Sequence, residues 1–192
     1  GRRSGSSCAT TVARDPLACV PADTDLAMTP HVHEAARLWV TRDDATDSPV
    51  VGLSELGALD GALEENLGAV TWAEAMAEAP ATEGALFVAA ALAFRAADPD
   101  RIAAVLQQAA LSDRRFREVE SAAGWIDLTP PLFALLDRWK TDRDALRRRL
   151  AIAGFAVHRI DPGEALTAAV CDPDLPLRTR AARAVWQLGR RD

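Results

Sequence analysis

The stretch Arg178-Thr179-Arg180-Ala181-Ala182-Arg183-Ala184-Val185-Trp186-Gln187-Leu188-Gly189 decides the fold, because its pattern recurs earlier in the chain. Its aromatic residue, Trp186, is preceded by Phe155, Trp125 and Phe94, at successive spacings of 31, 30 and 31 residues. The chain holds only five phenylalanines and five tryptophans, so this regular spacing indicates a repeat of about 31 residues. Repeats of this length are typical of stacked supersecondary units, which usually bind partners and seldom carry out chemistry.

An arginine stands eight positions before each of the last three aromatic residues. These arginines are Arg117, Arg147 and Arg178. If the repeat keeps its phase, they form a ladder along one face of the array, and we regard the ladder as a candidate site for an acidic partner. The competing interpretation is that they are solvated arginines whose aliphatic stems cover apolar surface.

Helix start signals divide the second half of the chain into three helical hairpins. A capping residue followed by a proline marks each first helix, at Asp98-Pro99, Thr129-Pro130 and Asp161-Pro162. Each second helix is expected to begin at a further capping residue, near Ser112, Thr141-Asp142 and Asp174. The predicted hairpins cover residues 98–126, 129–158 and 161–189.

The composition favours helices throughout. Hydrophobic residues make up 49% of the chain, and most of them are alanine and leucine rather than β-branched residues. Helix start signals also precede the hairpins, at Thr29-Pro30, Ser54, the capping box Thr71-Trp72-Ala73-Glu74 and Thr82. We therefore predict an all-α protein, with an N-terminal helical region over 28–97 and a helical-hairpin solenoid over 98–192.

Residues 1–27 lack a helical period, and we expect them to be disordered or a non-native leader, with Met28 as a candidate translation start. The cysteines, Cys8, Cys19 and Cys171, do not have zinc-type spacing. A Cys8–Cys19 disulfide is the alternative if the protein is exported. Because nothing else suggests a disulfide scaffold, a reducing, cytoplasmic compartment is the simpler expectation. No apolar run reaches the roughly 18 residues of a membrane span, so we expect no membrane contact.

The net charge of −6 is unevenly distributed. Residues 28–97 hold eleven acidic and three basic residues, whereas residues 98–192 hold fourteen acidic and sixteen basic residues. The hairpin half is therefore locally basic but nearly balanced. Nucleic-acid binding requires a concentrated positive face, so this balance argues against nucleic acid as a partner.

Candidate catalytic and metal-binding residues are few. His31 and His33 form an H-x-H pair, but two residues apart on a helix they point about 200° away from each other, which argues against a metal site. His158 ends a predicted second helix, where a donor to terminal carbonyls is favoured over a catalytic base. No nucleophile, phosphate-binding or dinucleotide-binding motif is present. We predict no enzyme activity, no cofactor and no metal.

The pattern over 172–189, with its D-P loop and the helix R-T-R-A-A-R-A-V-W-Q-L-G, resembles a HEAT repeat. A larger part of the chain, about 30 to 191, resembles an uncharacterised proteobacterial family of HEAT-repeat proteins. The residues that carry this resemblance are Glu34 to Trp39, Leu53 to Leu67, and His158 to Leu166. Members of that family are linked to type VI secretion gene clusters.

The resemblance implies a HEAT-like solenoid that acts as a protein-binding scaffold or adaptor, with cargo or spike assembly in type VI secretion as the specific expectation. Family members are longer, so the resemblance also implies that the array is truncated. The alternative is an enzyme accessory, similar to the HEAT-like lyases that act on a bound chromophore or protein. Oligomeric state and the identity of the partner stay open at this point.

Overall fold

The protein is helical throughout the part that the computed structural model describes, residues 30–46 and 52–190. The described residues form ten α-helices and no strand, which confirms the all-α prediction. The predicted leader, 1–27, and Met28 lie outside them. The helices are α1 Pro30–Thr46, α2 Leu53–Gly68, α3 Trp72–Glu78, α4 Ala85–Ala96, α5 Pro99–Ala109, α6 Asp113–Trp125, α7 Pro130–Trp139, α8 Ala145–Val157, α9 Glu164–Val170 and α10 Leu175–Leu188.

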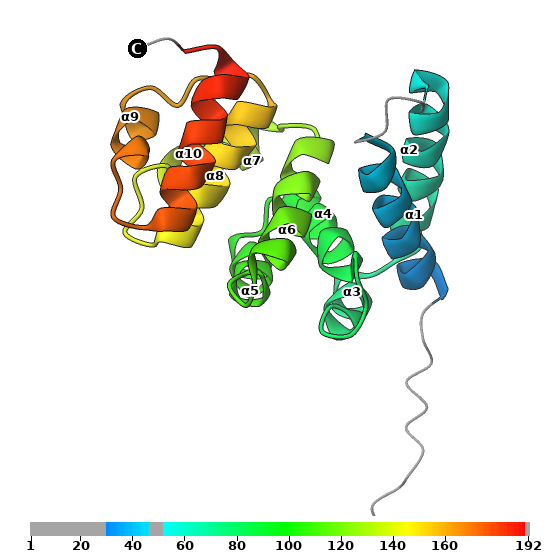
Figure 1. Ribbon diagram of the computed structural model, residues 1–192. Coiled ribbons are helices and arrows are strands. Elements are labelled where there is room, and N and C mark those ends of the chain that lie inside the picture. The colour runs from blue at the N-terminus through cyan, green and yellow to red at the C-terminus, as the bar shows by residue number, and fades with distance from the viewer. Residues whose placement is uncertain (1–29, 47–51, 191–192) are drawn as a thin grey trace, which may run out of the picture.

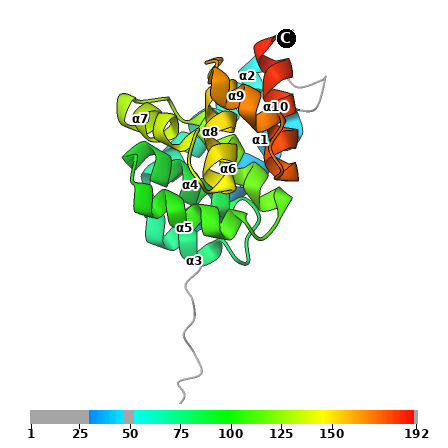
Figure 2. The ribbon, with the colours of Figure 1, turned by 90° about the vertical axis from the view of Figure 1, so that its left-hand side faces the viewer.

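The helices follow one another across the molecule, from the α1/α2 pair on one side to the α9/α10 pair on the other (Figure 1). Turned by 90°, the molecule shows α9 and α10 in front of α1 and α2 (Figure 2). Helix α4 packs on α6, α6 packs on α8, and α8 packs on α10. The intervening helices α5, α7 and α9 each contact the helix that follows them in the chain. The helices α4, α6, α8 and α10 therefore form a continuous series in which each contacts the next. The helices α5, α7 and α9 complete the hairpins.

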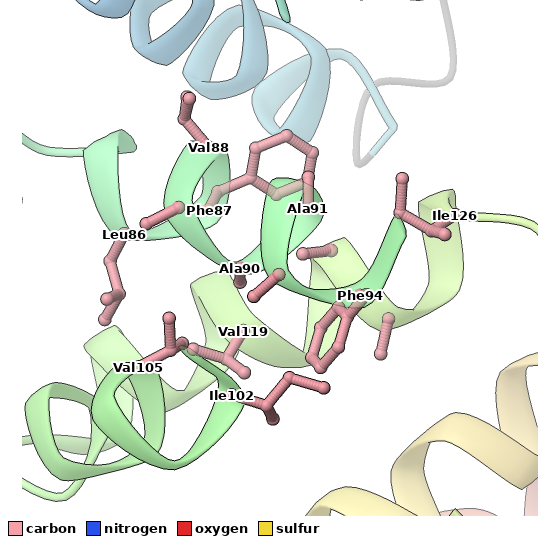
Figure 3. Close-up of a cluster of buried hydrophobic side chains, with 14 of the residues drawn as sticks. Leu86, Phe87, Val88, Ala90, Ala91, Phe94, Ile102, Val105, Val119 and Ile126 are labelled. Carbon is pink, nitrogen blue, oxygen red and sulfur yellow. The ribbon is translucent and has the colours of Figure 1, made fainter. Parts of the chain in front are cut away.

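The core is centred on α4, which is buried on almost all sides. The ring of Phe87 stacks on Trp39 of α1, with 5.3 Å between ring centroids. Nearer the C-terminal end of α4, Phe94 points toward Ile102 of α5 and Val119 of α6 (Figure 3). A helix covered from several directions needs no polar face, which explains its nearly uninterrupted apolar sequence. One apolar cluster extends from α1 to α8, across the predicted boundary at residue 98.

Helix α4 begins at Ala85, slightly later than the Thr82 signal predicts, because two other residues fix its start. Gly84 adopts φ +85°, and a Cβ at that position would lie 2.6 Å from the backbone oxygen of Ala36. The buried carboxylate of Glu118, from α6, faces the backbone of Phe87 and Gly84 at this end of the helix. A negative charge is favourable there, because the first backbone N–H groups have no partner within the helix. Burial nevertheless raises the pKa of Glu118, with the backbone N–H groups of Phe87 and Gly84 opposing the shift.

Four of the predicted capping residues are confirmed, whereas α2 has Gly52 rather than Ser54 as its N-cap and Thr129 caps α7 without a side-chain hydrogen bond. Asp98, Ser112 and Asp174 accept backbone hydrogen bonds at the first turns of α5, α6 and α10, and Thr71 with Glu74 forms the predicted capping box. These residues set the positions of the hairpin helices relative to the sequence.

Two predicted helix starts are wrong for the same physical reason. Helix α8 begins at Ala145 rather than near Thr141, and α9 begins at Glu164 rather than at Pro162. In each loop an aspartate accepts a hydrogen bond from the backbone N–H two residues later, Asp142 from Asp144 at 2.9 Å and Asp161 from Gly163 at 2.8 Å. This local turn competes with helix formation and delays the helix by a few residues.

The second helices of the hairpins match one another when they are counted from their N-caps, Ser112, Asp144 and Asp174. Positions six, seven and ten after the N-cap are buried in all three helices. These are Glu118, Val119 and Ala122 in α6, Leu150, Ala151 and Gly154 in α8, and Arg180, Ala181 and Ala184 in α10. The N-caps are therefore the correct reference for comparing the hairpins.

The aromatic repeat does not follow this register. Trp125, Phe155 and Trp186 stand thirteen, eleven and twelve residues after their N-caps. Each residue of offset turns a helical side chain by about 100°. Phe155 is accordingly 2% exposed, whereas Trp186 is 84% exposed. The expectation that Trp186 repeats the position of Phe155 is wrong, because the N-caps of α8 and α10 are 30 residues apart and the two aromatics are 31 apart.

Candidate binding site

A hollow of about 370 Å³ lies where α6, α8 and α10 meet. We call it the arginine groove, because Arg117, Arg149, Arg180 and Arg183 line it together with Asp113, Leu175, Pro176 and Thr179. Arg117, Arg149 and Thr179 each stand five residues after the N-cap of their helix. Equivalent positions of three successively packed helices therefore form this part of the surface.

Arg180 forms the floor of the groove and is only 6% exposed. Its Nε lies 3.0 Å from Glu120 Oε1. Its Nη1 donates to Gln187 Oε1 at 3.1 Å, and its Nη2 donates to the backbone oxygen of Ala153 at 3.3 Å. Arg180 is therefore held by α6, α8 and its own helix, and its main role is structural.

Arg149 is also largely buried and is engaged within the protein. Its guanidinium lies over the ring of Phe116, 3.7 Å from the centroid, as in a cation–π contact. Nη1 donates to Asp113 Oδ1 at 3.0 Å, and Nε lies 4.0 Å from Glu120 Oε1. Arg149 therefore shares the carboxylate of Glu120 with Arg180.

The single carboxylate of Glu120 faces several guanidinium groups. Burial raises the pKa of Glu120, while the positive charges of Arg180, Arg149 and Arg183 act to lower it. Burial has the opposite effect on the cation and lowers the pKa of Arg180. The negative charge of Glu120 acts to raise this pKa, whereas the positive charges of Arg183 and Arg149 lower it further. The arginines thus repel one another, and an additional negative charge in the groove would relieve this repulsion.

Arg117 and Arg183 are the two exposed arginines of the groove. Within residues 30–46 and 52–190, neither forms a hydrogen bond or an ion pair, in contrast to Arg149 and Arg180. A guanidinium presents several N–H donors in a planar fork that matches a carboxylate or a phosphate. The groove therefore offers two unused cationic groups to an anionic ligand.

The predicted ladder is not assembled by the structure, although Arg117 does lie in the groove. Arg147 lies over the ring of Trp139, 5.4 Å from its centroid, and its Nη1 is 3.3 Å from Asp142 Oδ2. Arg178 donates through Nη1 to the backbone oxygen of Asp172 at 2.6 Å. Both thus bind the loops before their own helices. The three arginines stand five, three and four residues after their N-caps, so they face different directions.

Sequence reasoning missed Arg149, Arg180 and Arg183 because it took its phase from the aromatics. The N-caps Ser112 and Asp174 were recognisable, and counting from them would have placed Arg117 level with Thr179. The ion pair between Glu120 and Arg180 had no signal in the sequence, since it joins two helices that are separated by a complete hairpin.

The histidines do not converge on a common site. His31 Nδ1 lies 3.2 Å from Asn66 Oδ1 of α2, whereas His33 Nε2 lies 3.3 Å from Glu78 Oε2 of α3. His158 Nε2 is 2.9 Å from the backbone oxygen of Ala123, in the last turn of α6. Because a carbonyl oxygen only accepts, Nε2 of His158 is the donor in this contact.

Metal binding, membrane crossing and free thiols are the remaining features of the structure that bear on function. Across the described parts of the chain, three or more histidine, cysteine or acidic side chains do not gather where they could hold a metal ion. In the same residues, no helix combines the length and the apolar character that crossing a bilayer requires. Cys171 is an exposed free thiol, and the other two cysteines lie outside the described residues.

Comparison with known proteins found no matching family model, no matching curated protein and no matching solved structure. The resemblance to HEAT-repeat proteins therefore remains a prediction based on the sequence pattern.

Proposed function

We propose that this protein is a scaffold or adaptor whose arginine groove binds an acidic segment of another protein. The observation that carries the proposal is the difference between the four arginines of the groove. Arg149 and Arg180 have carboxylate partners within the chain, whereas the exposed Arg117 and Arg183 do not have such a partner among the residues that the structure describes. The unpaired guanidinium groups of Arg117 and Arg183, which line a groove whose floor is Arg180, are suited to bind two carboxylates of a partner segment.

We further propose that the hairpins form a short HEAT-like solenoid. The successive packing of α4, α6, α8 and α10 supports this arrangement, and the recurrence of buried positions six, seven and ten supports it as well. In such an array the second helices share one surface, so that a groove across α6, α8 and α10 binds an elongated partner.

Charge favours a protein segment over nucleic acid as the ligand. Proteins that bind nucleic acid through its backbone commonly neutralise about six to ten phosphates. The arginine groove has two unpaired arginines, which is far fewer cations than such a phosphate backbone requires. An acidic peptide with a few carboxylates requires a much smaller positive surface.

The proposed partner class includes components of type VI secretion, as the sequence resemblance implies. This part of the proposal is tested by capture of partners from the source organism. A secretion component that is recovered with the wild-type protein, and lost when the groove is altered, is the expected result. Recovery of no secretion component would refute that assignment without affecting the acidic-segment proposal.

The central experiment measures binding of a fluorescently labelled polyglutamate peptide by anisotropy. We expect the double variant Arg117→Glu/Arg183→Glu to bind at least about tenfold more weakly than the wild type, because attraction becomes repulsion at both positions. The matched control is Arg138→Glu, which reverses an exposed arginine of α7 outside the groove. Affinity should decrease as salt is added, since exposed charges are screened.

Two results would contradict the proposal. One is equal peptide binding by the wild type and the groove variant when circular dichroism shows both to be folded. The other is a clear preference for a DNA duplex over polyglutamate, with the groove variant losing both, which would identify the groove as a nucleic-acid site.

A further inference from the structure

Two large apolar side chains on α10 are exposed beside the arginine groove. Trp186 is 84% exposed and Leu175 is 61% exposed. Of the five large hydrophobic residues with high exposure in the described residues, these two lie on the same helix. Exposed apolar residues are common singly, but a tryptophan exposed to this extent is unusual and is typical of an interaction site.

Leu175 and Trp186 share a face of α10 with residues of the groove. Leu175, Thr179, Arg183 and Trp186 are spaced i, i+4, i+8 and i+11, so their side chains leave the helix in similar directions. The first three line the arginine groove, and Trp186 follows Arg183 after less than one turn. This face therefore presents an apolar group, an unpaired cation and a second apolar group in order.

The apolar surface continues past Trp186 toward α9. A second hollow, of about 360 Å³, is lined by Leu166 and Val170 of α9 and by Ala182 and Val185 of α10, among others. Val185 directly precedes Trp186 in the chain, and Ala182 stands one turn before it. Trp186 thus lies between a cationic hollow and an apolar hollow.

We propose that the segment bound by the arginine groove is amphipathic, with carboxylates that contact Arg117 and Arg183 and an apolar side chain that contacts Trp186. This inference rests on the proposed function and specifies the chemistry of the partner. Tryptophan and arginine are the residues most enriched among those that dominate binding energy at interfaces. The eleven positions from Leu175 to Trp186 correspond to about 16 Å of helix, so the partner segment must extend over that distance.

The test compares two labelled peptides of equal charge. In one, glutamates are flanked on both sides by leucines; in the other, the leucines are replaced by serines. We expect Trp186→Ala to weaken binding of the leucine peptide about tenfold and to leave binding of the serine peptide unchanged. Leu53→Ala is the matched control, since Leu53 is an exposed apolar residue of the distant helix α2. This control should bind both peptides as the wild type does.

The two peptides separate this inference from the proposed function. If the serine peptide binds and Trp186→Ala does not weaken the leucine peptide, the amphipathic partner is refuted while the acidic-segment proposal stands. If neither peptide binds the wild type, both are refuted. Sedimentation of the full chain tests a second copy as the occupant: a dimer that Trp186→Ala converts to a monomer would show that a second copy covers this face, and would overturn the inference.

Discussion

Removing the carboxylate of Glu120 should destabilise the whole protein, because Glu120 is the shared counter-ion beneath the arginine groove. In Glu120→Gln, Arg180 keeps its buried position but loses the negative charge 3.0 Å from its Nε. Arg149, whose Nε is 4.0 Å from the same oxygen, loses its second carboxylate. Removing one partner of a buried pair costs about 3 to 5 kcal/mol. We expect about 3 kcal/mol at most, because Glu120 keeps some solvent contact and because burial, which raises its pKa, already disfavours its charged form.

The ion pair between Glu120 and Arg180 should contribute much less to the free energy of unfolding than the loss in Glu120→Gln suggests. Desolvation of two charges largely offsets their attraction, so apolar replacements of similar volume are often neutral. The double variant Glu120→Leu/Arg180→Met is therefore expected to recover most of the stability that Glu120→Gln loses. The single variant Arg180→Met should resemble Glu120→Gln, because it leaves the carboxylate without its nearest partner.

Urea unfolding followed by circular dichroism measures these differences, and coincidence with tryptophan fluorescence checks that the transition is two-state. A loss of about 3 kcal/mol also lowers the melting temperature by about 6 to 12 °C for a chain of this size. Burial raises the pKa of Glu120, so this group favours the folded state less as pH rises through its pKa, and all variants must be compared at one pH. Unfolding free energies of Glu120→Gln and wild type within about 0.5 kcal/mol would refute the reasoning.

Other predictions concern the backbone and the pH dependence. Gly84→Ala should cost at least about 2 kcal/mol of unfolding free energy, because φ is +85° and the new Cβ would meet the chain at 2.6 Å, whereas Gly57→Ala, within α2 and in open space, should gain about 1 kcal/mol. Equal effects of the two substitutions in urea unfolding would contradict this. The pKa of Asp172 is held below its usual value, first by the hydrogen bond from the backbone of Asp174 and also by Arg148. The contribution of Asp172 to the free energy of unfolding is therefore complete above the unfolded pKa of 3.8 and is lost as pH falls through the lower folded pKa. We expect Asp172→Asn to make the free energy of unfolding less dependent on pH in the acid range, without a new transition near neutral pH.

The fold class could be predicted from sequence because its signals are local. Capping residues such as Asp98 and Ser112 act within a few residues, and the alternation of short helices and loops follows from them. The starts of α8 and α9 could not be predicted, since Asp142 and Asp161 look like caps but form turns. Recognising those turns needs the geometry of the loop.

The candidate site could be predicted only in part, since it depends on how successive helices are rotated relative to one another. Arg117 was selected by its spacing from Trp125, which happened to choose a residue of the groove. The same spacing selected Arg147 and Arg178, which bind their own loops. Whether Arg117, Arg147 or Arg178 binds a partner stays a prediction. Distances along the sequence are reliable within one helix, but loops of different length change the spacing between equivalent positions of successive helices, so a fixed spacing selects different faces.

The unequal spacing of the N-caps has a consequence for how such chains diversify. Ser112 and Asp144 are 32 residues apart, and Asp144 and Asp174 are 30 apart. Positions six, seven and ten after each N-cap are buried nonetheless, so a loop can gain or lose residues without turning the helix that follows it. Deleting or inserting one residue within a second helix would instead turn every later side chain by about 100° relative to the N-cap. An aromatic that fills the interior eleven residues after one N-cap becomes an outward-facing group twelve residues after another. The count from the N-cap is thus a heritable means of giving one repeating unit a new recognition surface while its neighbours keep the old one.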